Sequence, residues 1–194
     1  MTAQVSDSLR YRDRTFSLVG VKGSELFDPS AHGLKPGGSI DSACWRGFVC
    51  TYGVSDGGLF LEKLGIELPQ EQKQAVKDGK GHPLFGKLPT YARRLTRRVL
   101  YENLHEPMPF SGGMLLATDF IEQLYVHMGF HPAWKFKEVH ELLFEEGRLV
   151  EEIDGSEAMA RARERIAASG LEPLKPAGMR EVDTWIEKTF RLDY

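Results

Sequence analysis

Both cysteines of the chain lie in one short segment, ACWRGFVCTY, which spans residues 43–52. A cysteine becomes nucleophilic when a nearby cation lowers the pKa of its thiol, and Arg46 closely follows Cys44. The spacing of Cys44 and Cys50 is not that of the Cys-X-X-Cys pairs that bind metals or exchange disulfides. If the segment is one continuous strand, the two thiols lie about 20 Å apart, too far for a disulfide. We interpret Cys50 as a buried core residue and retain Cys44 as a candidate nucleophile.

Tyr125 and His127, in the segment YVHMGF, are the other candidates for chemistry. In an enzyme acting on a small polar or anionic substrate, Arg46 would hold the anion and His127 would act as a general acid or base. Cys44 or Tyr125 would assist the reaction. These four side chains are the candidate catalytic residues, and their site would lie in a cleft between the two strongest hairpins of the chain.

Three histidines, His127, His131 and His140, suggest a metal site as an alternative. The first two have the four-residue spacing with which histidines on one helix can share an ion. Gly129 stands between them and is expected to end the helix, so the shared face is lost. The chain also lacks the common zinc-protease, nucleophile-elbow and P-loop motifs. We expect neither a metal nor a cofactor.

Charged residues are unevenly distributed, with a basic stretch at 69–98 and an acidic one at 138–154. The ordinary explanation is a pair of solvated faces that attract each other within the fold or across a dimer. The alternative is a docking strip for an anionic partner such as RNA. A net charge of −3 makes nucleic acid an unexpected partner. The strip would consist of Arg93, Arg94, Arg97 and Arg98.

The last predicted helix, at 179–190, places apolar residues on one side. Such a stripe closes the protein's own core or contacts a partner, and the sequence leaves both open. Trp185 would anchor the contact if a partner, such as a second copy of the chain, binds there. The candidate partner interface consists of Trp185, Ile186 and Phe190.

Turn and capping signals divide the chain into short elements. Acidic-Gly pairs between runs of β-forming residues predict hairpins, and apolar residues at three- and four-residue spacing predict helices. Asp28, Pro29 and Gly33 are typical of the start and end of a short helix. We expect hairpins at 9–23, 45–66 and 134–154, a strand at 111–117, helices at 28–33, 69–77, 89–104, 118–129, 156–170 and 179–190, and frayed residues at 1–8.

The predicted fold class is α+β, with antiparallel β-hairpins, flanking helices and C-terminal helices. Both halves contain a strand, a Gly-X-X-Pro helix end and an acidic-Gly hairpin followed by Leu. One interpretation is a β-α-β-β unit used twice in one curved sheet or barrel; the other is a chance recurrence of common helix-ending residues. We expect a main domain at 9–154, including the basic excursion at 69–98, and a helical extension at 155–194.

The composition is that of an ordinary globular protein of 194 residues. No apolar run approaches the roughly 18 to 20 residues that a membrane span requires, and the N-terminus lacks the apolar core of a secretory signal. Two cysteines in such a chain fit the reduced thiols of the cytoplasm. We expect a cytoplasmic protein with no membrane partner.

The segments ACWRGFVCTY, PFSGGMLLATDF and YVHMGF resemble those of a family of uncharacterised bacterial proteins, over most of residues 10–153. The resemblance implies no activity, so it assigns no catalytic residue. Because no catalytic motif is complete and the C-terminal stripe is apolar, we predict a binding or assembly protein that self-associates, with a small-molecule ligand also open. The alternative is the enzyme described above, which requires its four candidate residues to share one cleft.

Overall fold

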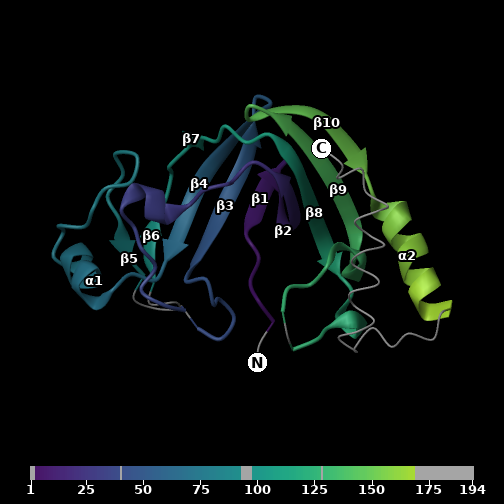
Figure 1. The fold of residues 1–194 in the computed structure, drawn as a ribbon, viewed down its shortest axis with the longest axis horizontal. Coiled ribbons are helices and arrows are strands. Elements are labelled where there is room, and N and C mark those ends of the chain that lie inside the picture. The colour runs from purple at the N-terminus through teal and green to yellow at the C-terminus, as the bar shows by residue number, and fades with distance from the viewer. Residues whose placement is uncertain (1–2, 40, 93–97, 128, 169–194) are drawn as a thin grey trace.

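The computed structural model describes residues 3–39, 41–92, 98–127 and 129–168. The described strands form one sheet that curves into an arch, with a helix outside each flank (Figure 1). The α+β class predicted from the sequence is therefore confirmed. In chain order the elements are β1 (Ser8–Tyr11), β2 (Arg14–Gly23), η1 (Pro29–His32), β3 (Phe48–Ser55), β4 (Gly58–Ile66), α1 (Gln70–Lys77), β5 (Thr90–Tyr91), β6 (Val99–Tyr101), β7 (Glu106–Pro107), β8 (Gly112–Phe120), η2 (Glu122–Leu124), η3 (Ala133–Lys135), β9 (Phe136–Glu145), β10 (Arg148–Asp154) and α2 (Ser156–Ala168), where η marks a 3₁₀ turn.

The strand order is β10-β9-β8-β2-β1-β3-β4-β6-β5, with β7 paired to β4. The paired strands are antiparallel, apart from β1 and β3, which run parallel. Asp56-Gly57 and Glu146-Gly147 have φ values of 50° and 73°, and of 48° and 78°. Positive φ at both central residues is typical of the tight turns that match the twist of paired strands. The three predicted hairpins are confirmed as β1–β2, β3–β4 and β9–β10, although β3 begins only at Phe48 and β9 at Phe136.

The same order of elements occurs in both halves. A strand, a 3₁₀ turn, a hairpin and a helix appear as β2, η1, β3–β4 and α1, and again as β8, η2 with η3, β9–β10 and α2. The two hairpin tips also pair reciprocally: Leu59 N donates to Gly147 O and Leu149 N donates to Gly57 O, each at 2.8 Å. The correspondence is incomplete, because β1 lies between β2 and β3 whereas β8 and β9 pair directly.

Two hydrophobic cores form on the two faces of the sheet. The larger one contains Tyr52 and Leu61 of the first hairpin together with Leu142 and Phe144 of β9, and none of these is more than 2% exposed. The space between the hairpins is therefore packed with side chains. The smaller core joins the sheet to α2 and includes Leu115, Val139, Met159, Ala162 and Ile166.

The helix predicted at 118–129 is wrong, because β8 continues to Phe120 and only the short turn η2 follows. Phe120 pairs with Phe136 of β9, and Asp119 adopts a φ of 57° rather than the extended conformation of a helix cap. Phe120 and Leu124, two of the residues that suggested a helical face, pack against the smaller core. Tertiary contacts thus override the helical spacing of this segment.

The helix predicted at 89–104 is also wrong where the structure describes it, because Thr90 pairs with Leu100 and Tyr91 with Val99 in β5 and β6. Residues 3–8 are ordered rather than frayed, as the next section describes. The helix at 69–77 is confirmed as α1, and most of the helix at 156–170 is confirmed as α2. The predicted helix at 179–190 lies outside the described residues.

The short helix predicted at 28–33 is confirmed as η1. Asp28 accepts a hydrogen bond from Ser30 N at 2.8 Å, and Gly33 ends the turn in the left-handed conformation with φ 77°. No helix within the described ranges is long and apolar enough to cross a membrane.

Candidate ligand-binding site

A cavity of about 350 Å³ lies beside β2, the N-terminal segment and the start of β3. This volume falls within the range of small-molecule binding sites. Two charged side chains, Asp7 and Arg46, face it together with the hydroxyl-bearing Ser6 and Tyr52. The rest of its lining is Leu18, Val19, Gly20, Val21, Leu26, Phe27, Phe48 and Phe130.

A β-bulge shapes one wall of the cavity. Leu18 pairs with Leu116 and Gly20 pairs with Leu115, so Val19 is an extra residue in β2. A bulge bends the strand and re-aims side chains, and bulges are frequent beside binding sites. Here Leu18 belongs to the larger core, while Val19 packs against the smaller core on the other face.

The charged residues that line the cavity form an ion pair between Asp7 and Arg46, which are 39 residues apart in the chain. Asp7 Oδ1 accepts hydrogen bonds from Arg46 Nη2 and from Cys50 N, the latter at 2.5 Å. Arg46 Nε donates to Phe48 O at 2.7 Å, and the guanidinium lies 4.6 Å from the centre of the Phe48 ring. Burial alone would lower the pKa of Arg46, but the charge and hydrogen bond of Asp7 outweigh it and raise the pKa. Arg46 is therefore a cation at neutral pH.

Gly47 explains how Arg46 reaches this position. Its φ is 78°, and a Cβ there would lie 2.2 Å from Gly38 O. The chain can pass so close to another backbone only at a glycine. The continuous strand expected through Cys44 and Arg46 is therefore wrong, because β3 begins at Phe48. Side chains alternate between the faces of a strand, and Phe48, Cys50, Tyr52 and Val54 of β3 all belong to or pack against the larger core.

Both thiols are free and buried. Cys44 is 2% exposed, and its Sγ lies 3.4 Å from Phe48 O, to which it donates. Burial raises the pKa of Cys44, and it raises the pKa of Cys50 still further. Since only the thiolate is a good nucleophile, neither environment activates its cysteine. The interpretation of Cys50 as a core residue is confirmed, at 0% exposure.

Tyr125 and His127 lie together in the connection between β8 and β9, with their ring centroids 4.9 Å apart. Neither is among the residues that line the cavity around Arg46, and neither is Cys44. Their loop does approach the cavity, because Gly129 O accepts a hydrogen bond from Gln4 N at 2.8 Å and Phe130 lines the wall. Of the four candidate catalytic residues, Arg46 alone lines this cavity.

The N-terminal segment is the part of the site that sequence reasoning missed. Gln4 and Asp7 are 8% and 9% exposed, although residues 1–8 were expected to be frayed. The Gln4 side chain accepts from Trp45 N at 3.0 Å and donates to Ser42 O at 2.9 Å. These bonds join the segment to the loop that carries Arg46. Two polar residues in an otherwise unremarkable terminus gave no signal of this role.

Large apolar side chains are exposed around the cavity. Val21 and Phe130 line it, at 43% and 56% exposure, and Trp45 and Val5 lie on the adjoining segments at 53% and 44%. Single exposed apolar residues are common, but a group of them beside a cavity is typical of a binding surface. Exposed apolar side chains therefore accompany the charged pair at this site.

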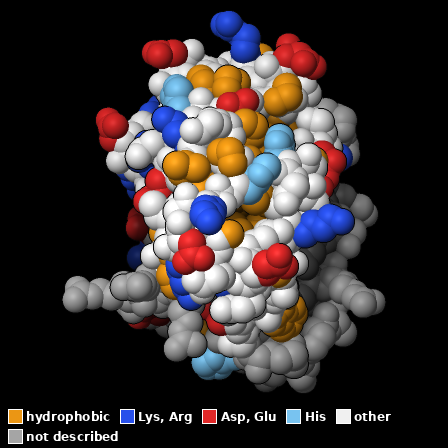
Figure 2. All heavy atoms as spheres, turned by 90° about the vertical axis from the view of Figure 1, so that its left-hand side faces the viewer, with side chains coloured by type: hydrophobic (Ala, Val, Ile, Leu, Met, Phe, Trp, Pro, Cys, Tyr) orange, Lys and Arg blue, Asp and Glu red, His pale blue; other side chains and the backbone are white. Residues whose placement is uncertain are grey.

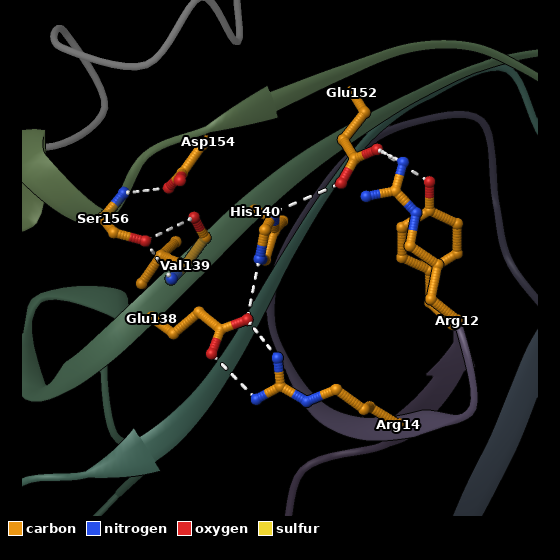
Figure 3. A network of polar contacts seen from close by, with 9 residues as sticks. Arg12, Arg14, Glu138, Val139, His140, Glu152, Asp154 and Ser156 are labelled. Atoms are coloured by element: carbon orange, nitrogen blue, oxygen red, sulfur yellow. Dashed lines mark hydrogen bonds and ion pairs between the residues drawn. The ribbon is translucent and has the colours of Figure 1, made fainter.

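A second set of polar residues joins the β1–β2 turn to β9 and β10 (Figure 3). Arg14 forms two hydrogen bonds with the Glu138 carboxylate, at 2.6 and 2.8 Å, and Arg12 pairs with Glu152 at 2.5 Å. His140 lies between these carboxylates, 3.0 Å from Glu138 and 3.4 Å from Glu152. The hydrogen bond from Arg14, followed by that from His140, lowers the pKa of Glu138. Complementary charges satisfy one another here, so the network holds the sheet together.

The histidines of the predicted metal alternative are divided between this network and the β8–β9 connection. His131 packs near Tyr125, at 5.2 Å between ring centroids, and burial lowers the pKa of His131. His140 belongs to β9. Over the described part of the chain, no three or more His, Cys, Asp or Glu side chains are grouped so as to hold a metal ion.

The face over α1 combines hydrophobic side chains, histidines and scattered charges (Figure 2). His32 stacks on Phe27, with 5.2 Å between the ring centroids, and meets Phe85 edge-on at 4.9 Å. Arg98, the described member of the predicted anion-binding strip, is 16% exposed and lies 3.6 Å from Asp41. The rest of that strip, Arg93, Arg94 and Arg97, and the predicted interface of Trp185, Ile186 and Phe190 lie outside the described residues.

In comparisons with known proteins, no family model, no curated protein and no solved structure matched the chain. The functional interpretation consequently depends on the site itself.

Proposed function

We propose that the protein binds a small amphipathic molecule in the cavity beside Asp7 and Arg46. The observation that carries this proposal is a cavity of about 350 Å³ whose wall combines apolar side chains with the Asp7–Arg46 ion pair. Ligand sites combine these features, because apolar walls supply affinity and a few fixed polar groups supply orientation.

The ion pair itself supports a role in recognition. Removing charges from water is costly, and a hydrophobic pair of similar size is often as stabilising as a buried ion pair. Asp7 is 9% exposed, and the Arg46 side chain is 36% exposed and faces the cavity. A binding role would account for a charged pair kept at the wall of the cavity.

Binding is favoured over catalysis by the state of the candidate catalytic groups. Burial raises the pKa of Cys44, which disfavours its thiolate. Cys44, Tyr125 and His127 are not among the lining residues, so a ligand beside Arg46 would not have them on the cavity wall. The free thiols fit a reducing compartment, and the proposal places the protein in the cytoplasm.

The neutral dye N-phenyl-1-naphthylamine tests the proposal, because its fluorescence rises in an apolar site. We expect saturable binding to the wild-type protein and at least tenfold weaker binding to Val21→Trp, which fills the edge of the cavity. Val150→Trp is the matched control, since Val150 is also an exposed valine on a strand, at 53% exposure, and does not line the cavity. Equal affinity in the two variants, or no binding to the wild type, would reject the proposal.

Self-association is the second candidate, favoured by the exposure of Trp45 and Phe130 at 53% and 56%. A second copy of the chain would cover this rim. Sedimentation velocity would then detect a reversible dimer that Phe130→Ser weakens and Leu88→Ser does not, Leu88 being exposed at 66% away from the cavity. A monomer at high micromolar concentration would exclude this candidate.

A further inference from the structure

We propose that the polar end of the ligand is an uncharged group with one hydrogen-bond donor and one acceptor side by side, as in a carboxamide. This inference rests on the proposed function, since it concerns the same cavity. It replaces the expectation that Arg46 binds an anion.

The hydrogen bonds of the ion pair leave a matching donor and acceptor. Those to the Asp7 carboxylate go to Oδ1, and those from Arg46 come from Nε and Nη2. Because the hydrogen bonds among the described residues use these atoms, Asp7 Oδ2 and Arg46 Nη1 are the acceptor and the donor that we assign to the ligand. An amide NH₂ can donate to the carboxylate oxygen while its C=O accepts from the guanidinium. Both new bonds involve a charged partner, and such bonds are stronger than those between neutral groups.

The charge of the site is balanced, which disfavours an ionic ligand. Asp7 and Arg46 are the only Asp, Glu, Lys, Arg or His residues among those that line the cavity. A carboxylate beside Arg46 would also meet the negative charge of Asp7, and an ammonium beside Asp7 would meet Arg46. Either ion would lose its hydration without a net opposite charge in return.

The walls indicate the rest of the ligand. Phe27, Phe48 and Phe130 line the cavity together with Leu18 and Leu26. Aromatic rings pack favourably against a flat aromatic body, and leucines accept any apolar group. The ligand class is therefore a small aromatic or aliphatic body that ends in a carboxamide-like group.

Two probes that differ only in the polar end test this inference: 1-naphthaleneacetamide and 1-naphthaleneacetate. By calorimetry at pH 7.5 we expect the amide to bind at least tenfold more tightly than the carboxylate. A carboxylate that binds equally or more tightly would overturn the inference and leave the proposed function intact. If N-phenyl-1-naphthylamine binds but the amide does not, the inference also fails alone. If none of the three compounds binds, the proposed function fails with it.

Asp7→Asn provides a second test, because it removes the negative charge and keeps an oxygen that can accept from Cys50 N. We expect the carboxylate to gain at least tenfold in affinity. Asp56→Asn is the matched control, with the same loss of charge at a hairpin turn that does not line the cavity. If Asp7→Asn does not fold, Arg46→Gln replaces it, and the amide should bind at least tenfold more weakly. No change in the affinity of either probe would overturn the inference.

Discussion

Gly57 and Gly147 join the two hairpin tips through reciprocal hydrogen bonds: the Gly57 carbonyl accepts from Leu149 N and the Gly147 carbonyl accepts from Leu59 N, each at 2.8 Å. This contact pairs β4 with β10 and closes the arch at the tips. The cavity lies toward the other end of β3, near Phe48. The contact between the tips therefore joins the β3–β4 hairpin, whose first strand lines the site, to the β9–β10 hairpin.

The first prediction concerns these two glycines. Both have positive φ, so alanine at either position should cost about 1–2 kcal/mol in the left-handed conformation. A Cβ at Gly147 would also lie 2.3 Å from Met108 O, whereas one at Gly57 would have no atom within 4 Å. Gly147→Ala should therefore lower the free energy of unfolding by about 1–3 kcal/mol more than Gly57→Ala, as measured in urea. Equal losses of unfolding free energy in the two variants would mean that Gly147 does not lie so close to the Met108 carbonyl.

Tyr101 gives a prediction at alkaline pH. Its hydroxyl donates to His82 O at 2.8 Å, and burial raises its pKa to about 12, against an unfolded value of about 10. Above pH 10 the unfolded state loses the phenol proton first, so the free energy of unfolding should fall as the pH approaches 12. Tyr101→Phe should cost about 1 kcal/mol at neutral pH, because the His82 carbonyl loses its partner. The free energy of unfolding of this variant should also fall less steeply between pH 10 and pH 12. The same steepness as in the wild type would contradict the assignment of the fall to Tyr101.

The cysteines should be unreactive in the native protein. Cys44 and Cys50 are buried and have raised pKa values, so iodoacetamide at pH 8 should modify neither until urea unfolds the chain. Mass spectrometry of Cys44→Ser and Cys50→Ser assigns any modification to one thiol. Native alkylation of Cys44 as fast as in urea would restore it as a candidate nucleophile.

Glu138 gives a prediction on the acid side. Arg14 and His140 lower its pKa in the folded state, so its contribution to stability is present above the unfolded pKa and is lost as the pH falls through the folded pKa. Urea unfolding between pH 6 and pH 3 should therefore show a shallower loss of stability for Glu138→Gln than for the wild type. Glu145→Gln, on the same strand, should leave the wild-type slope. Identical slopes for both variants would show that the network does not bind the carboxylate.

The sequence predicted the hairpins well because their turn chemistry is local. Asp56-Gly57 and Glu146-Gly147 adopt positive φ, and the β-forming residues that pair across each turn are neighbours in the chain. The capping residue Asp28 acted in the same local way. By contrast, the apolar spacing at 118–129 resembled a helix, and only the pairing of β8 with β9 decided against it.

The site was less predictable, because it depends on long-range contacts. Arg46 was identified as an anion-binding candidate, but its partner Asp7 lies 39 residues away in a segment expected to be frayed. The break at Gly47 depends on the approach of Gly38 O, which no local pattern indicates. Sequence reasoning therefore identified Arg46 but not its partner Asp7. It also placed Arg46 within a strand, whereas β3 begins only at Phe48.

The location of a bound probe tests the account most directly. In the ¹⁵N-labelled protein, saturating 1-naphthaleneacetamide should shift the backbone amide signals of Ser6, Asp7, Val21 and Arg46 most, since these residues line the cavity. The amides of Gly57 and Val150 should stay in place. Shifts confined to other surfaces, or none at all, would contradict a ligand site at the Asp7–Arg46 pair.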